Sequence, residues 1–219
     1  MFNEFVDLTH TLENEIPCFH ANWHVPFTIK QLGRIEEVGR ETRHISMGTH
    51  TGTHMDAPRH FIPNGKTIES IPLSTLCGKV NIIDFSFLEE NSAVTIDLLK
   101  KIEVTERMLF YFGWSKYWKD TAKFYKAYPY FTEEAVNYLI EKNIKLIGMD
   151  TPSPDDSRVK LLSEKDSLIH KLFLKNEVVL VEYLNNLDIA LEHNDWNIIA
   201  LPLKIKEGDG SPSRIILTR

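Results

Sequence analysis

The chain has little cysteine, no long apolar run and no excess of positive charge. Its 219 residues include two cysteines, Cys18 and Cys77, and no CxxC pair. So few thiols exclude a disulfide framework and indicate a reducing compartment. No stretch approaches the roughly 20 apolar residues of a membrane-spanning helix. The formal net charge is −6, with lysines and arginines scattered among acids. This argues against a nucleic-acid partner, because no basic stripe is present to displace counterions.

The N-terminal segment has acids where a signal peptide would have a basic start, and no apolar run follows it. We therefore expect a cytoplasmic protein without a membrane partner. With 42% hydrophobic residues, the chain can bury one substantial core. We predict a single domain that spans residues 1–219.

Apolar alternation and apolar runs predict strands along much of the chain. These segments are residues 5–8, 27–32, 43–47, 79–85, 108–112, 145–149, 178–182, 197–203 and 213–218. Residues 95–102 have helical spacing, and a second helix has Thr132 at its N-cap. A capping box of Ser163 and Asp166 predicts a third helix that runs to about residue 175. Mixed strands and helices without a repeat predict an α/β fold, with a mixed β-sheet flanked by a few helices.

Residues 44–60 read HISMGTHTGTHMDAPRH and contain four of the nine histidines of the chain. Imidazole and carboxylate together form the ligand set of a borderline divalent ion such as zinc or manganese. A further histidine beside such a set is placed to move protons. The run predicts a metal-dependent enzyme.

Spacing within the run selects three ligands. In an extended chain, the side chains of His50, His54 and Asp56 point to the same side. His54 and Asp56 would then lie roughly 6–7 Å apart at Cα, but His50 and His54 roughly 13 Å apart, which is too far for one ion. The chain must bend between them, and Gly52 is the residue able to bend. A helix is disfavoured by the threonines of the run and the proline that follows.

We expect different roles for the two other histidines of the run. His44 lies outside the same-face set, and we expect it to be structural. His60 follows the turn at Pro58 and could be a ligand, a proton shuttle or a hydrogen-bonding residue. We favour the proton shuttle.

Two distant residues are polar in apolar surroundings. Glu182 lies within the run VVLVEYL, where an unpaired buried carboxylate would be costly. His170 lies in a helical segment among leucine, isoleucine and phenylalanine. From the local sequence alone, a strand-end carboxylate and a hydrogen-bonded core histidine explain them as well as metal ligands do.

Residues 50–60 resemble the signature H-x-G-T-H-x-D-x-P-x-H of the cyclase family, which contains bacterial kynurenine formamidase and isatin hydrolase. Four further segments of this chain resemble sequence motifs of that family, in the same order and over nearly the whole length of the chain. They are residues 65–68 (GKTI), 112–115 (FGWS), 148–153 (GMDTPS) and 202–212 (PLKIKEGDGSP).

The resemblance implies a swivelling β/β/α fold and a site with two divalent ions. One ion would be held by His50, His54 and Asp56. Asp56 and Glu182 would bridge the ions, and His170 would bind the second one. The expected metal is zinc, with manganese as the alternative, and the expected assembly is a homodimer or a higher homo-oligomer.

The resemblance also implies an activity, in which His60 is the proton donor and acceptor. We expect a metal-dependent hydrolase of an amide C–N bond that uses metal-bound hydroxide. The expected reaction is that of an arylformamidase in tryptophan catabolism (the kynurenine pathway), from N-formylkynurenine to kynurenine and formate. The alternatives are an isatin-like cyclic amide hydrolase and a non-catalytic metal-binding module, although a module would not need a spare proton carrier. A structural zinc domain would prefer a closed site rich in cysteine.

The N-terminal segment departs from the family pattern. Kynurenine formamidases of this type have a tryptophan followed by Pro-Gly-Asp, where the aromatic ring helps to hold substrate. Here residues 17–22 read PCFHAN. Phe19 keeps an aromatic side chain, and we predict that it lines the pocket for a small-molecule amide. An aromatic residue of the core or of a subunit interface is the alternative.

Overall fold

The computed structural model describes residues 4–219, and one large mixed sheet dominates it. Its strand order is β5 (Cys77–Lys79), β12 (Asn197–Pro202), β13 (Gly210–Thr218), β4 (His54–Asp56), β11 (Val179–Glu182), β10 (Leu146–Met149), β8 (Arg107–Tyr111) and β6 (Asn81–Asp84), with β1 (Phe5–Asp7) beside β13. The pairs among β6, β8, β10 and β11 are parallel. The other pairs of this sheet are antiparallel.

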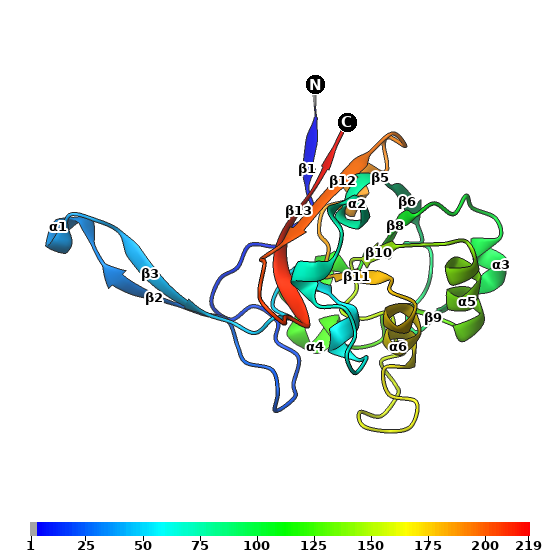
Figure 1. Cartoon of the computed structure of the whole chain (residues 1–219), viewed down its shortest axis with the longest axis horizontal. Coiled ribbons are helices and arrows are strands. Elements are labelled where there is room, and N and C mark those ends of the chain that lie inside the picture. The colour runs from blue at the N-terminus through cyan, green and yellow to red at the C-terminus, as the bar shows by residue number, and fades with distance from the viewer. Residues whose placement is uncertain (1–3) are drawn as a thin grey trace.

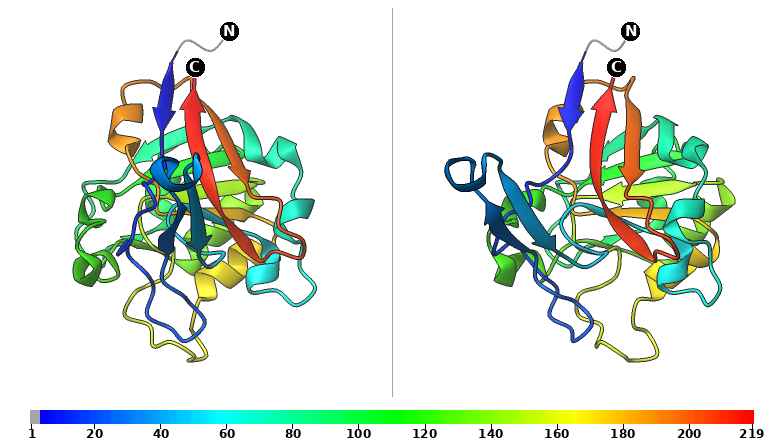
Figure 2. Two further views of the ribbon diagram at one scale, coloured as in Figure 1. Left: turned by 90° about the vertical axis from the view of Figure 1, so that its left-hand side faces the viewer. Right: turned by 60° about the vertical axis from the view of Figure 1, so that its left-hand side comes forward.

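The sheet curves strongly at β13, which connects its two parts. Residues 210–212 pair with β4, whereas residues 213–218 pair with β12. As a result, β12 and β13 run across the direction of β10 and β11 (Figure 2). The sheet is thereby nearly barrel-shaped, and β4 lies where its two parts meet.

Two apolar cores occupy the two faces of the sheet. Leu180 and Phe110 pack with residues of the helices α3 (Ile96–Leu99), α5 (Glu133–Glu141) and α6 (Leu168–Lys175). Val181 and Leu109, their neighbours along the strands, pack into the core on the other face. This is the alternation of a strand that is covered on both sides. Helices α3, α5 and α6 lie together on one side of the sheet (Figure 1).

The remaining elements are short. They are α2 (Leu73–Leu76), α4 (Thr121–Phe124), α7 (Leu187–Ala190), the 3-10 turns Pro58–His60, Ile68–Ser70 and Ser115–Tyr117, and the parallel pair β7 (Ala93–Val94) and β9 (Tyr130–Phe131). Within residues 4–219, no helix has the length and apolar composition needed to cross a bilayer.

A β-hairpin extends far from this body as an arm (Figure 1). The arm consists of β2 (Thr28–Gly33), α1 (Ile35–Val38) and β3 (Thr42–Ser46), and its two strands pair with each other. Leu32, Ile35, Val38 and Ile45 are between 51% and 64% exposed. His44 lies on β3 and is exposed, so the structure keeps it out of the histidine cluster.

The α/β fold with a mixed sheet is as predicted, and Thr132 caps α5 by accepting a hydrogen bond from the N–H of Ala135 (3.2 Å). The helix expected over residues 95–102 is only the single turn α3. The domain limits at residues 1 and 219 stay a prediction.

The predicted start of the third helix at Ser163 is wrong, because α6 begins at Leu168. The carboxylate of Asp166 accepts a hydrogen bond from the N–H of Leu162 (2.7 Å) and closes a turn instead of a capping box. The free N–H groups at the start of α6 are satisfied from a distant loop. There, Asp155 accepts hydrogen bonds from Ile169 and His170.

Candidate metal centre

Strand β4 and the bend before it place the first three side chains. His54 and Asp56 are two residues apart on β4, so both point to the helix-covered face. Gly52 has a φ of 60°, and a Cβ there would lie 2.5 Å from Leu12 Cδ2. A left-handed backbone in so little space requires glycine. The bend returns His50 towards the strand, so that its Nδ1 lies 2.7 Å from Asp56 Oδ1.

Strand β11 and helix α6 bring the two distant residues to the same place. Glu182 pairs with His54 in the antiparallel ladder, and its Oε2 lies 3.5 Å from His54 Nε2. His170 reaches down from α6, with Nε2 3.0 Å from Glu182 Oε1 and 3.6 Å from Asp56 Oδ2. Tertiary packing, not sequence proximity, assembles this half of the site.

The five side chains form two overlapping groups. His50, His54 and Asp56 make one, and Asp56, His170 and Glu182 make the other, each with its ligand atoms within 4.8 Å of one another. Asp56 belongs to both groups and is buried, as are His54, His170 and Glu182. The structure therefore brings together all five predicted ligands, and their coordination of an ion stays a prediction.

Hydrogen bonds fix the orientation of the imidazoles. His54 Nδ1 lies 2.8 Å from the carbonyl oxygen of Gly52, and His170 Nδ1 lies 2.5 Å from Asp155 Oδ2. In each ring the other nitrogen faces Asp56 and Glu182. Metal-binding histidines have this arrangement, in which an outer acceptor fixes the tautomer and leaves the second nitrogen for the ion.

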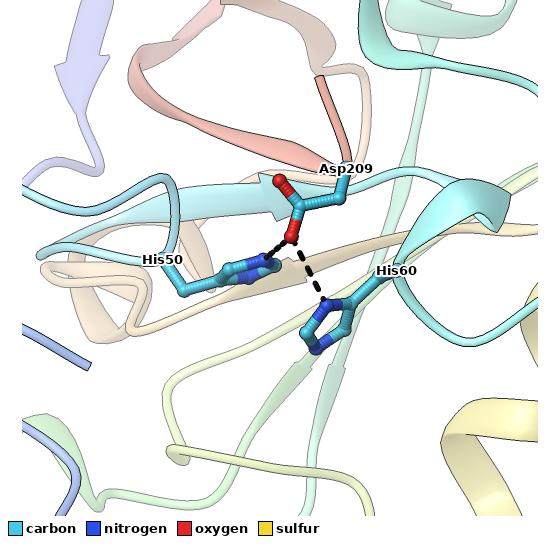
Figure 3. A group of neighbouring side chains, drawn as sticks. All are labelled: His50, His60 and Asp209. Atoms are coloured by element: carbon cyan, nitrogen blue, oxygen red, sulfur yellow. Dashed lines mark hydrogen bonds and ion pairs between the residues drawn. The ribbon is translucent and has the colours of Figure 1, made fainter. Parts of the chain in front are cut away.

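A third group joins His50 and His60 through Asp209 (Figure 3). Asp209 Oδ2 lies 2.8 Å from His50 Nε2 and 3.4 Å from His60 Nδ1. The centroids of the two rings are 3.9 Å apart. The side chain of His60 is 20% exposed, so it lies at the open side of the cluster.

Analysis of the sequence did not identify Asp155 or Asp209 as parts of the site. Asp155 lies in a proline-rich loop and Asp209 in the segment 202–212 that resembles a family motif. Neither has a local spacing that points to a histidine. That resemblance was the one available signal for Asp209.

The chemistry of the cluster fits a divalent metal. Within residues 4–219, no group makes a well-aligned hydrogen bond to the buried atoms Asp56 Oδ2 and Glu182 Oε1, although His170 Nε2 lies 3.0 Å from the latter. Burying carboxylate oxygens without a donor or a cation is costly. Three imidazoles and two carboxylates are the ligands that zinc and manganese accept, so these residues are suited to hold such ions.

The carboxylates control the proton affinity of the site. Burial alone would raise the pKa of Asp56, but the charges of His50 and His60 and hydrogen bonds from His50 and His54 hold it well below its usual range. Burial alone would lower the pKa of His50, but Asp56 and Asp209 raise it to about 10. A metal ion that binds at His50 must therefore displace a proton, which makes metal binding weaker as the pH falls.

An aromatic wall lies beside the cluster. The ring centroid of Phe19 is 5.6 Å from that of His24 and 5.7 Å from that of Tyr125. His24 in turn lies 6.2 Å from His50, and the hydroxyl of Tyr125 is 3.2 Å from that of Tyr183. Phe19 is 37% exposed, so the structure places it near the histidines with part of its ring open.

Several known proteins are similar to this chain in sequence and in fold. Residues 6–156 match the Cyclase family, described as "Putative cyclase". A kynurenine formamidase of Bacillus thuringiensis subsp. konkukian is 32% identical, over 98% of this chain and 97% of that protein. Isatin hydrolase A of Labrenzia aggregata, solved with benzyl benzoate, has a TM-score of 0.86 and 29% identity, over 98% of this chain and 93% of that one. A predicted metal-dependent hydrolase of Bacillus stearothermophilus has a TM-score of 0.78 and 25% identity, over 98% of both chains. The chain therefore belongs to the cyclase family and is a hydrolase of that family.

Proposed function

We propose that the protein is a metal-dependent hydrolase of an amide C–N bond, and that its substrates are N-formylated aromatic amines. The observation that carries this proposal is the cluster itself. Three oriented imidazoles and two buried carboxylates converge, and His60 lies at their open side. The relatives named kynurenine formamidase support the formamide as substrate, since the likeness extends over nearly the whole of both chains.

The residues would hold two divalent ions. His50, His54 and Asp56 would hold one, and Asp56, Glu182 and His170 the other. Zinc suits this set better than harder cations, because three of the five ligands are imidazoles. When bound, such ions lower the pKa of a water and polarise the substrate carbonyl.

The chain itself supplies proton transfer and substrate orientation. With Nδ1 of His60 towards Asp209, its Nε2 is free to take a proton from the attacking water and then give it to the leaving nitrogen. The rings of Phe19 and Tyr125 can contact a flat aromatic amine. Such contacts contribute roughly 0.5–1.5 kcal/mol beyond area burial.

A cyclic aromatic amide such as isatin is the second candidate substrate. Structural similarity favours it, since isatin hydrolases A of Ralstonia solanacearum and Labrenzia aggregata have TM-scores of 0.87 and 0.86. The bond cleaved is again an amide beside an aromatic ring. The difference is that opening the ring leaves the amine and the new carboxylate in one product, whereas a formamide gives an amine and formate.

Product analysis on a small panel tests the proposal. Zinc-loaded protein is incubated with N-formylkynurenine, formanilide, isatin and an aliphatic formamide, and formate and ring-opened isatin are measured. We expect the two aromatic formamides to have the largest kcat/KM. Faster opening of isatin would select the second candidate. Metal binding without turnover on the whole panel would indicate a non-catalytic module.

We further propose that the protein forms a homodimer through the arm. A two-stranded hairpin on its own is marginal in water, and this one exposes Leu32, Ile35, Val38 and Ile45. At its base, a groove on the body is lined by Met47 and by the leucines at positions 12, 201 and 203, together with polar residues. Arm and groove on one chain are complementary surfaces that a two-fold axis uses twice.

We also propose a cytoplasmic location. Both cysteines are free thiols, as expected in a reducing compartment.

A further inference from the structure

Backbone pairing, not a flexible loop, delivers Asp209 to the histidine cluster. The residue directly precedes β13, and Gly210 pairs with Asp56 in the β4–β13 ladder. The carbonyl oxygen of Asp209 accepts a hydrogen bond from the N–H of Ala57 (2.9 Å). The position of its carboxylate is therefore set by the strand that carries Asp56.

The carboxylate of Asp209 contacts two histidines for which we propose different tasks. One oxygen, Oδ2, faces His50 Nε2 at 2.8 Å and His60 Nδ1 at 3.4 Å (Figure 3). The next residue, Gly210, also packs closely on the ring of His50. A Cβ at Gly210 would lie 2.7 Å from His50 Cε1 and 3.1 Å from His50 Nε2. This close contact restricts how the His50 ring can move or turn.

We propose that Asp209 is a positioning residue that orients the metal ligand His50 and the proton carrier His60 at the same time. By binding Nε2 of His50, it keeps Nδ1 of that ring directed towards Asp56. By facing Nδ1 of His60, it leaves Nε2 of that ring for the substrate. The second task rests on the function proposed above, whereas the first requires only that the protein binds a metal.

The geometry also explains why one carboxylate can serve both rings. The two rings are tilted by 33° with centroids 3.9 Å apart, and one nitrogen of each faces Asp209 Oδ2. Outer acceptors of metal-bound imidazoles typically change metal affinity or activity by 10–100-fold when removed. Here both quantities are expected to depend on the same side chain.

Metal affinity tests the first task without any substrate. Zinc binding is measured by competition with a chelator for Asp209→Ala and for the isosteric Asp209→Asn. We expect 10–100-fold weaker binding in the alanine variant and an intermediate loss in the asparagine variant, whose side-chain oxygen still accepts a hydrogen bond. Glu207→Gln is the control, because it removes the same charge from an exposed position of the same loop.

Two results would overturn the first task. One is unchanged zinc affinity in both Asp209 variants, each of which is first checked for native circular dichroism. The other is the loss of one whole equivalent of zinc with normal affinity for the remainder. That result would make Asp209 a ligand of an ion between His50 and His60.

A double-mutant cycle tests the second task on whichever amide the panel identifies. With zinc at saturation, Asp209→Ala should lower kcat 10–100-fold and leave KM within about two-fold. In the His60→Ala background the same change should have almost no further effect, because the group that it orients is gone. Fully additive losses, or a change in KM alone, would contradict the proposal.

If the protein hydrolyses no amide, 15N NMR of its histidine rings replaces the kinetic readout. Zinc-loaded protein should show one tautomer for His60, with the proton on Nδ1. Asp209→Ala should show a mixture of both tautomers. The same single tautomer in both proteins would contradict the second task whatever the enzyme acts on.

Discussion

The metal centre and the arm depart from ordinary burial in opposite directions. The centre buries Asp56, Glu182, His54 and His170, whereas the arm exposes Leu32 and Ile35 on a hairpin that pairs with itself. Charged groups are rarely buried unless they are paired, and adjoining apolar groups on a projecting segment commonly mark an interface. The buried carboxylates of the centre therefore need positive charge, and the apolar side chains of the arm need a surface to cover them. We propose that cations bind in the centre and that a second chain covers the arm.

The two regions also differ in how strongly the fold constrains them. In the centre, strand register positions His54, Asp56 and Glu182, and the bend at Gly52 positions His50. In the arm, the β2–β3 register includes an irregularity between Gln31 and Gly33, and every residue of β3 is exposed. Substitutions should thus change chemistry in the centre and assembly in the arm.

The largest effect is expected at Asp56, the residue that belongs to both ligand groups. Asp56→Asn replaces a shared carboxylate by a neutral amide, so both ions should be lost. Turnover should fall at least as far as when proton transfer is removed, which is roughly 10²–10⁴-fold. Elemental analysis gives the metal content, and a variant that keeps one full equivalent would show that Asp56 is not shared.

His60→Ala should separate chemistry from metal binding. We expect native metal content and a loss of turnover of roughly 10²–10⁴-fold, because the proton carrier is missing. Both quantities are measured on the same purified sample. If the ion is lost together with the activity, His60 is a ligand and not a proton carrier.

Glu182→Gln should lower metal affinity and the thermal stability of the metal-loaded protein together. The variant leaves a polar amide in a buried strand, and it weakens the binding of an ion that stabilises the folded state. We expect a loss of affinity of about 100-fold or more, beyond the usual effect of outer partners. Leu180→Met, on the same face of β11, is the control for packing and should keep its metal. Unchanged occupancy in both Glu182→Gln and His170→Ala would contradict the second ion.

In the arm, Leu32→Asp combined with Ile35→Asp should produce a monomer and leave metal content unchanged. Burial of one such side chain contributes roughly 1.5–3 kcal/mol, so the pair should weaken association by about 100-fold or more. Light scattering after size-exclusion chromatography measures the mass. Glu37→Lys on α1 is the control that changes charge without removing apolar surface. If the unmodified protein is already a monomer, the proposal that the arm forms a dimer is contradicted.

The smallest effect is expected at the aromatic wall. Phe19→Ala should raise KM for an aromatic formamide several-fold, as expected for stacking contacts of roughly 0.5–1.5 kcal/mol, with no change in metal content. An aliphatic formamide should show no such change. Equal effects on both substrates would mean that Phe19 supports the loop and does not contact the ring.

The sequence predicted the parts of the site that depend on local geometry. The shared face of His54 and Asp56 follows from strand periodicity, and the bend at Gly52 follows from the length that one ion must span. His170 and Glu182 stood out only as polar residues in apolar surroundings, and the family resemblance was needed to join them to the site. Sheet pairing between segments more than 100 residues apart brings such groups together.

What the sequence did not predict has the same physical origin. Asp155 accepts hydrogen bonds from the first turn of α6, which begins at Leu168 and not at Ser163. The strands of the arm were predicted close to their observed limits, but alternation does not reveal whether a face is covered. The exposure of Leu32 and Ile45 could therefore be learned only from the structure.

Anomalous diffraction from zinc-loaded crystals, recorded above and below the zinc edge, tests the central claim most directly. Our account predicts two peaks per chain. One should lie among His50, His54 and Asp56, and the other among Asp56, His170 and Glu182. The absence of both peaks, a single peak, or a peak enclosed by His50, His60 and Asp209 would contradict it.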